Sequence, residues 1–384
     1  MTTHVIAPID LPAFLAPTIA AALDEADSQA EIPQRLHSQL RDAGAFRMLT
    51  PREYGGSETP LTELLEVYER FGHIDASTGL LVWNANFGFI AALLSEAGAQ
   101  RIWPSGTEPT LANSGVPGVA ARTAGGYRLS GRMPIVTGIG FADWFIAVGV
   151  VTENGEPCIT AAGGSDVRLF AVQRGQFTIE HTWNVTGMRG SGSNDVVVAD
   201  AFIPDDLVAA LDPPALIDRP LYRGFIPTLV FPGATAVVLG VARRAIEETV
   251  TLAPSKTLLS GGALADSPRV QYIIAKSEAA VAAAKLLLIN AADSLQRSAE
   301  SNTTVSLQQR ADLRAAMTHA AQVSRDALVA MYELASSTAL YRTNPIERVF
   351  RDGMAALQHA NHSAQFLEAA GRVRFGIEPG MPLF

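Results

Sequence analysis

Apolar residues recur at three- and four-residue spacing over the first hundred residues of the chain. The positions that show this spacing most clearly are Leu36, Leu40, Phe46, Leu61, Leu64, Leu65, Tyr68 and Phe71. Such spacing places apolar side chains on one face of a helix, so it predicts a helical first unit over residues 11–101. A turn is predicted at residues 51–56, Pro-Arg-Glu-Tyr-Gly-Gly, because proline and paired glycines interrupt helices.

The helical spacing disappears between residues 109 and 204, where glycines become dense. Runs of β-branched and aromatic residues stand there between turn signals, which is the pattern of short strands. The predicted strands include residues 127–130, 144–148, 167–172, 177–179 and 196–198. We expect a small β domain, built as an antiparallel barrel or sandwich.

After Pro227 the chain is rich in alanine and helical in pattern through Ala370, with breaks near residues 254–268 and at residues 344–345. These breaks predict four long helices of the antiparallel bundle type. The chain is therefore predicted to be α+β, with a helical domain at 1–108, a β domain at 109–210 and a helical bundle at 211–384.

Segregated helices and strands argue against a doubly wound sheet of the nucleotide-binding type. The sequence also contains neither a strand-Gly-x-Gly-x-x-Gly-helix fingerprint nor a Walker A motif. We therefore expect no nicotinamide or ATP site in the chain itself.

Charge and composition exclude several classes of function. A formal net charge of -9 and a pI near 5.3 argue against a nucleic-acid partner, because such binding needs clustered Lys and Arg. The single cysteine, Cys158, excludes an internal disulfide and a cysteine-based zinc site, and no metal is expected. Since no signal peptide and no apolar run of about 20 residues is found, we expect a soluble, cytoplasmic protein without a membrane partner.

Two segments of the predicted β domain carry candidate chemistry. Residues 187–193 read Gly-Met-Arg-Gly-Ser-Gly-Ser, a composition that brings backbone N–H groups, hydroxyls and a cation toward an anion such as phosphate. A glycine-rich hairpin loop without a ligand has the same composition. Residues 131–138, followed by Ala-Asp-Trp at 142–144, are explained equally well as a strand, a turn and a second strand.

Taken together, these segments resemble the β domain of the acyl-CoA dehydrogenase superfamily. The residues that carry the resemblance are Gly125-Gly126-Tyr127, Gly131, Thr137-Gly138, Ala142-Asp143-Trp144, Trp183 and residues 187–193. The turn at 51–56 and the Arg-x-x-Arg-Asp series at 348–352 extend the resemblance over nearly the whole chain. It implies an acyl-CoA dehydrogenase-like fold, a flavin held against the β domain, and a homotetramer.

The resemblance also implies roles for individual residues around that flavin. Thr137 is similar to the hydroxyl near flavin N5, Trp183 is expected to pack against the isoalloxazine, and Ser193 is expected to approach the ribityl-phosphate part. The other residues expected to bind the cofactor are Gly138, Ser191, Asn113, Ser114 and Lys256.

The carboxylate base of acyl-CoA dehydrogenases has no counterpart in this sequence. Its commonest position, eight residues after the Arg-Asp pair, is Ala360, and the alternative position falls near Val230. No acidic residue lies between Leu221 and Arg244. Because acid–base help contributes about 10²- to 10⁴-fold, its loss argues against α-proton abstraction.

A histidine stands in this region instead. His359 follows Asp352 by seven residues, and His362 is expected one turn further on the same helix face. This arrangement resembles the flavin-dependent monooxygenase branch, whose members take reduced flavin from a separate reductase. The resemblance implies that His359 and Thr137 are catalytic, since imidazole exchanges protons near neutral pH. The residues expected to line the substrate pocket are Trp83, Asn84, Asn86, Phe87 and His362.

The sequence is thus interpreted as the oxygenase component of a two-component system. Such a protein hydroxylates a small aromatic or heterocyclic substrate with O₂ and reduced flavin, FMNH2 or FADH2, that an NAD(P)H:flavin reductase supplies. One alternative is an acyl-CoA dehydrogenase or oxidase of small acyl thioesters that uses another base. A second is a non-catalytic flavin- or ligand-binding relative.

Overall fold

Helices and strands occupy separate parts of the chain in the computed structural model, which describes residues 6–105, 107–160, 163–211, 215–224, 226–259, 261–381 and 384. The helices of the first part are α1 (Leu11–Ala20), α2 (Leu23–Gln29), α3 (Gln34–Asp42), α4 (Leu61–Ile74), α5 (Ala76–Ala85) and α6 (Glu96–Ile102). The strands are β1 (Leu111–Thr123), β2 (Gly126–Val136), β3 (Trp144–Glu153), β4 (Glu156–Pro157), β5 (Val167–Gln173), β6 (Thr178–Glu180), β7 (Asn194–Pro204) and β8 (Val208–Ala210). The helices of the last part are α7 (Ile226–Val230), α8 (Pro232–Leu252), α9 (Pro268–Glu300), α10 (Leu307–Ala335), α11 (Pro345–Ala356) and α12 (Gln365–Arg374).

The strands form one sheet in the order β6-β7-β2-β1-β3-β5-β8, with β4 paired to β3. Every pair is antiparallel except β1 with β3, which run parallel. The expectation of a wholly antiparallel barrel or sandwich is therefore wrong at this pair. The reason is geometric. Strand β2 turns back from β1 and pairs with one of its edges, so β3 pairs with the other edge. Because the chain has turned twice by then, β3 points in the same direction as β1.

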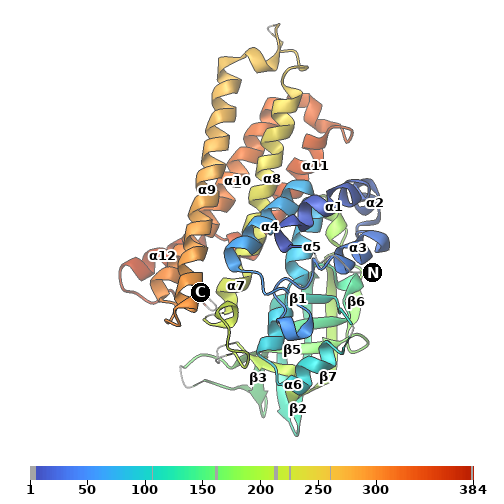
Figure 1. Ribbon diagram of the computed structural model, residues 1–384, viewed down its shortest axis with the longest axis vertical. Helices are drawn as coiled ribbons and strands as arrows, with labels where there is room; N and C mark the ends of the chain where they lie inside the picture. The colour runs from blue at the N-terminus through green and yellow to red at the C-terminus, as the bar shows by residue number, and fades with distance from the viewer. Residues whose placement is uncertain are drawn as a thin grey trace.

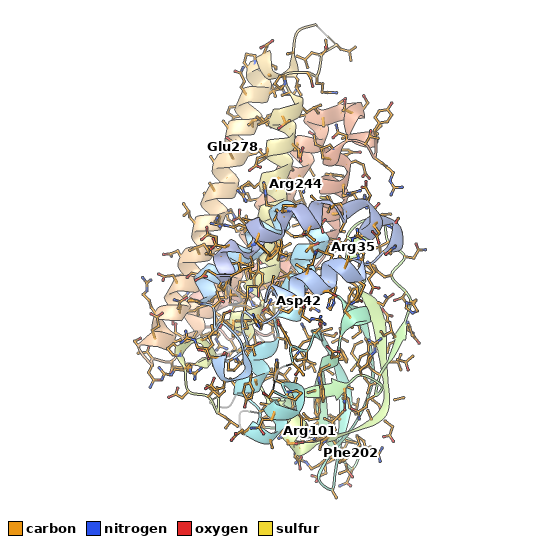
Figure 2. All side chains as sticks on the ribbon, turned by 45° about the vertical axis from the view of Figure 1, so that its right-hand side comes forward. Arg35, Asp42, Arg101, Phe202, Arg244 and Glu278 are labelled. Carbon is orange, nitrogen blue, oxygen red and sulfur yellow. The ribbon has the colours of Figure 1, made fainter. Side chains whose placement is uncertain are left out.

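Helices α4 and α5 of the first helical part lie between the sheet and the long helices (Figure 1). Helix α5 contacts α8 on one side, and on the other it contacts β1 and the short helical turn Arg189–Ser191. Glu278 on α9 and Phe202 on β7 lie toward opposite ends of the molecule (Figure 2). Side chains of α5 are thus positioned where all three parts meet.

The C-terminal bundle differs from the predicted four long helices. Helices α8, α9 and α10 are long, but the fourth is divided into α11 and α12. The backbone leaves the helix after Ala356, and His359 has extended dihedral angles, φ −59° and ψ 136°. Its Nδ1 accepts a hydrogen bond from the backbone N–H of Asn361, at 3.2 Å. Because polar side chains that bond nearby backbone compete with helical hydrogen bonds, the helix predicted through Ala370 is wrong at residues 357–364.

Two glycines allow α4 and α8 to touch through their backbones. A Cβ added to Gly72 would lie 2.2 Å from the carbonyl oxygen of Val237, and one added to Gly240 would lie 1.9 Å from that of Glu69. The stretch Ile226–Leu252 is, among the described residues, the one helical segment long and apolar enough to span a membrane, and 83% of its apolar window is buried inside the protein. A core helix meets the same criteria as a membrane span, and this burial is that of a core helix.

We expect Gly240→Ala to lower the free energy of unfolding by about 1–3 kcal/mol, because the new methyl group forces α8 away from α4. Gly371→Ala is the matched control, since Gly371 lies in α12 with nothing within 4 Å of an added Cβ. There the higher helix propensity of alanine should raise stability by up to about 1 kcal/mol. Denaturant unfolding followed by circular dichroism measures both variants. Equal effects would contradict a direct backbone contact at Gly240.

Candidate active site

A cavity of about 590 Å³ lies where the first helical part, the sheet and the bundle meet. Its size is that of an ordinary small-molecule site. Apolar side chains form most of its walls, among them Leu80, Phe87, Val148, Leu169 and Val230. Polar groups enter at a few places only, and these decide what the cavity can bind.

Three hydroxyls form one hydrogen-bonded row on the β-domain side of the cavity. Thr137 Oγ1 lies 2.9 Å from Ser193 Oγ, which lies 2.8 Å from Ser191 Oγ. The row is held at both ends, since Gly138 N donates to Ser191 O at 3.0 Å and Thr137 O accepts from Asn84 Nδ2 at 2.8 Å. Gly138 adopts φ +71°, a left-handed conformation that suits glycine at this turn. All three hydroxyl-bearing residues are buried, so the row offers fixed donors and acceptors to a polar ligand edge.

The peptide of Met188 joins this row to the bundle. Its carbonyl oxygen accepts hydrogen bonds from Ser191 Oγ at 2.8 Å and from Trp183 Nε1 at 3.1 Å. Its N–H donates to Asp352 Oδ1 on α11, at 2.8 Å. Burial, with a smaller contribution from Asp75, raises the pKa of Asp352 to about 7, although Arg351 and the Met188 N–H act in the opposite direction. One buried carboxyl group thus fixes the Met188 peptide against α11.

An ion-pair network continues from this carboxyl group to the first helical part. Arg351 Nη1 lies 2.8 Å from Asp27 Oδ1 and 3.3 Å from Asp352 Oδ1, and its Nε lies 3.0 Å from Glu347. Asp27 is in α2, so the network ties α2, α11 and the loop together. This arrangement gives Arg351 and Asp352 a structural role at one wall of the cavity.

Helix α5 supplies Trp83 and Asn84 to the cavity. Trp83 Nε1 donates to Val230 O at 2.8 Å, and Asn113 Nδ2 donates to Asn84 Oδ1 at 2.8 Å. Asn86 lies outside the cavity lining. Its side chain accepts from Met48 N and donates to two backbone carbonyls, those of Ala45 and Val82. These bonds hold the end of α5 and account for the amide of Asn86.

His359 is held as a neutral hydrogen-bond donor at the cavity wall. Its ring packs edge-on against Trp83, at a centroid distance of 5.2 Å and an angle of 82°. Because Nδ1 accepts from Asn361 N–H, the proton of the neutral ring is on Nε2. Burial lowers the pKa of His359 to about 4, so the ring is neutral at pH 7. The ring of His362 lies 5.9 Å away, and its burial lowers its pKa to about 3.

The structure brings most of the predicted site residues together. Those that line the cavity are Trp83, Asn84, Phe87, Asn113, Ser114, Thr137, Trp183, Ser191, Ser193 and His359. Gly138, Asn86 and His362 are neighbours of these residues and do not line it. Lys256 lies elsewhere, between α8 and α9, where its Nζ donates to Thr338 Oγ1 at 2.8 Å. The structure thus does not bring Lys256 to this cavity.

Sequence reasoning missed Arg314, Phe231 and Phe366, which also line the cavity. Arg314 is buried in α10 among apolar neighbours such as Leu313 and Met317. A charged residue on the apolar face of a predicted helix was the available signal. No Asp or Glu is among the described residues of the lining, so these walls lack the carboxylate that α-proton abstraction needs.

Comparisons with known proteins agree with this arrangement. The family model of the acyl-CoA dehydrogenase N-terminal domain matches residues 11–104, and that of the acyl-CoA dehydrogenase C-terminal domain matches residues 233–364. Indole-3-acetate monooxygenase of Acinetobacter baumannii is 30% identical over 364 residues, which cover 94% of this chain and 91% of that protein. The chain belongs to the acyl-CoA dehydrogenase family.

Within the family it is a flavin-dependent monooxygenase, as the resemblance implied. A second relative is the FADH(2)-dependent resorcinol hydroxylase, oxygenase component, of Rhizobium sp. The two sequences are 26% identical over 375 residues, which cover 91% of this chain and 89% of that protein. XiaF from Streptomyces sp., solved in complex with FADH2 and glycerol, has a TM-score of 0.90 and 25% identity, and covers 98% of this chain and 96% of XiaF. The predicted family and fold class are confirmed.

The residues of this family member fit a flavin. A flat aromatic ring system needs apolar walls for its faces and donors or acceptors for its polar edge. Trp183 and Met188 provide the first, and the row Thr137, Ser193 and Ser191 provides the second.

We expect Asp352→Ala to lower the free energy of unfolding by about 1–3 kcal/mol, because it leaves the buried Met188 N–H without an acceptor. The loop with Trp183 and Ser191 should loosen, and the affinity for reduced flavin should fall as well. Asp312→Ala, which breaks an exposed pair with Arg374 on the same bundle, should change neither quantity appreciably. Thermal unfolding and anaerobic flavin titration measure the two effects. An unchanged flavin affinity in Asp352→Ala would show that the loop is held by other contacts.

Proposed function

We propose that this chain is the oxygenase component of a two-component system that hydroxylates a small aromatic substrate with O₂ and reduced flavin. The observation that carries the proposal is that a neutral imidazole donor, His359, and a row of buried hydroxyls, Thr137 and Ser193, line one mainly apolar cavity. The relatives support it by name, since one is an indole-3-acetate monooxygenase and another a resorcinol hydroxylase.

The β-domain wall would hold the cofactor. Bound reduced flavin supplies the electrons that activate O₂. Trp183 would lie along the ring system, and the hydroxyls of Thr137 and Ser193 would bond its polar edge. XiaF binds FADH2, and FMNH2 carries the same ring system, so we propose that either form serves.

His359 would donate a hydrogen bond into the cavity from the C-terminal bundle. Its Nε2–H is the donor available to an oxygen atom of O₂ or of a substrate hydroxyl, because Nδ1 is held by Asn361. Edge-on packing against Trp83 fixes the direction of that donor. The apolar walls exclude water, which strengthens such a hydrogen bond and protects reactive oxygen from side reactions.

A separate NAD(P)H:flavin reductase would supply the reduced flavin, because the sequence has no nicotinamide fingerprint and the Rhizobium relative is called an oxygenase component.

We further propose a homotetramer in the cytoplasm. Large apolar side chains on the surface favour assembly, and the exposed ones include Tyr272, Leu286, Leu287, Leu340 and Tyr341.

The direct test supplies the purified protein with indole-3-acetate, NADH, FAD or FMN, and O₂, with and without a flavin reductase. We expect hydroxylated product only when the reductase is present, with one atom of ¹⁸O₂ incorporated by mass spectrometry. Rapid NADH oxidation by the protein alone would contradict the two-component proposal. Bleaching of bound FAD by acyl-CoA thioesters would favour the dehydrogenase alternative instead.

His359→Phe keeps a ring against Trp83 but removes the Nε2–H donor. We expect the rate of product formation to fall by about 10²- to 10³-fold, the usual cost of removing one fixed hydrogen-bond donor, with hydrogen peroxide released in place of product. His359→Gln keeps an N–H donor and should lose less. His319→Gln, on the exposed face of α10, is the matched control.

The pH profile gives a second readout for His359. Because its folded pKa is lowered to about 4 from 6.5, the neutral donor persists from pH 8 to about pH 5 and is lost as the pH falls through 4. The contribution of the neutral ring to the free energy of unfolding changes in the same direction. It is fully present above pH 6.5 and declines as the pH falls toward 4, because over this range the unfolded chain binds a proton at His359 that the folded chain does not. The opposite result would be a rate of product formation that changes near pH 6.5 in the wild type but not in His359→Phe. It would show that the ring of His359 is not buried as described.

A further inference from the structure

Arg314 is the one residue with a formal charge at pH 7 among the described residues that line the cavity. It comes from α10 and is only 3% exposed. Burial lowers its pKa to about 9, which still leaves the guanidinium charged at neutral pH. Apolar walls screen a charge little, so an anionic ligand beside this guanidinium is attracted more strongly than it would be in water.

Two aromatic rings hold the guanidinium in place. Its central carbon lies 4.2 Å from the ring centroid of Phe231 and 4.1 Å from that of Phe366. Rings at these distances stabilise a cation and restrict its orientation. Arginine presents its N–H groups in the guanidinium plane, as a fork that matches a carboxylate. The stacked group is thus organised in advance for a planar anion.

Arg314 belongs to the same wall as His359. Asn361 donates its backbone N–H to His359 Nδ1 and its side-chain Nδ2 to the carbonyl oxygen of Phe231, at 3.2 and 3.3 Å. Phe231 in turn contacts the guanidinium. A continuous set of contacts therefore fixes the imidazole and the cation relative to each other.

We propose that the substrate is an aromatic acid whose carboxylate pairs with Arg314 while its ring lies beside His359. This inference rests on the proposed function and names the substrate class of that site. Indole-3-acetate, the substrate named for the Acinetobacter relative, has this chemistry. The phosphate of the flavin is another anion. Arg314 and its aromatic partners, however, come from the helical bundle, whereas Thr137, Trp183 and Ser193 come from the β domain.

Binding is tested with pairs of compounds that differ in the carboxylate: indole-3-acetate with 3-methylindole, and 4-hydroxyphenylacetate with 4-methylphenol. Titration calorimetry on the full chain compares wild type, Arg314→Met, Arg314→Lys and Arg310→Met, the last on α10 outside the cavity lining. We expect wild type to prefer the acids. Arg314→Met should weaken acid binding by about 10- to 100-fold, the value of a charge-assisted hydrogen bond, and leave the neutral partners unchanged. Arg314→Lys should lie between, and Arg310→Met should equal wild type.

Three results would overturn the inference. The first is wild type that binds acids no better than their neutral partners, a result that needs no variant and holds if Arg314→Met fails to fold. The second is an equal loss for both members of each pair, as a structural role predicts. The third is a loss of FADH2 affinity in anaerobic titration with acid binding intact, which would assign the guanidinium to the flavin phosphate. If acid binding depends on Arg314 but the bound acid is not hydroxylated, the result would support this inference and contradict the proposed function.

Discussion

The hydrogen bond from the Met188 N–H to the buried carboxyl group of Asp352 connects the β domain to the bundle at the cavity. The loop that carries Trp183 and Ser191 has no regular secondary structure of its own beyond one short helical turn, so its position depends on bonds such as this one and those from Arg189 to Asp27 O and from Arg351 to Thr186 O. A buried carboxyl group with a raised pKa is costly. Its retention here is explained by the placement of a wall that neither domain could fix alone.

Burial is the second constraint, and it sets the charge state of the two titratable groups described above, His359 and Arg314. Burial keeps His359 neutral and shifts the pKa of Arg314 in the same direction, but from so high a starting value that the guanidinium stays charged. One desolvation effect thus yields a neutral donor and a cation in a single wall. Hydroxyls, which carry no charge, occupy the side expected to receive the cofactor.

The sequence predicted the order of helices, strands and helices because periodicity is a local property that survives folding. Thr137, Trp183 and Ser193 were found through a family resemblance, and they do line one cavity. Tertiary relations were out of reach. Nothing local distinguishes Asn84, which faces the cavity, from Asn86, whose amide is used to hold the end of α5. Arg314 was missed because its aromatic partners come from α12 and the start of α8, far away in the chain. The parallel pairing of β1 with β3 depends on which edge was already taken.

The hydrogen bond that fixes the tautomer of His359 also decides how protons can travel. A histidine in a relay receives a proton on one nitrogen and passes it on from the other. Here Nδ1 faces a backbone N–H, which has no proton to give. His359 is therefore not a relay: the neutral ring donates a hydrogen bond from Nε2 but passes no proton on through Nδ1. In the proposed reaction the protons that move would have to come from substrate, cofactor or water inside the cavity, because the backbone side of the ring offers them no exit.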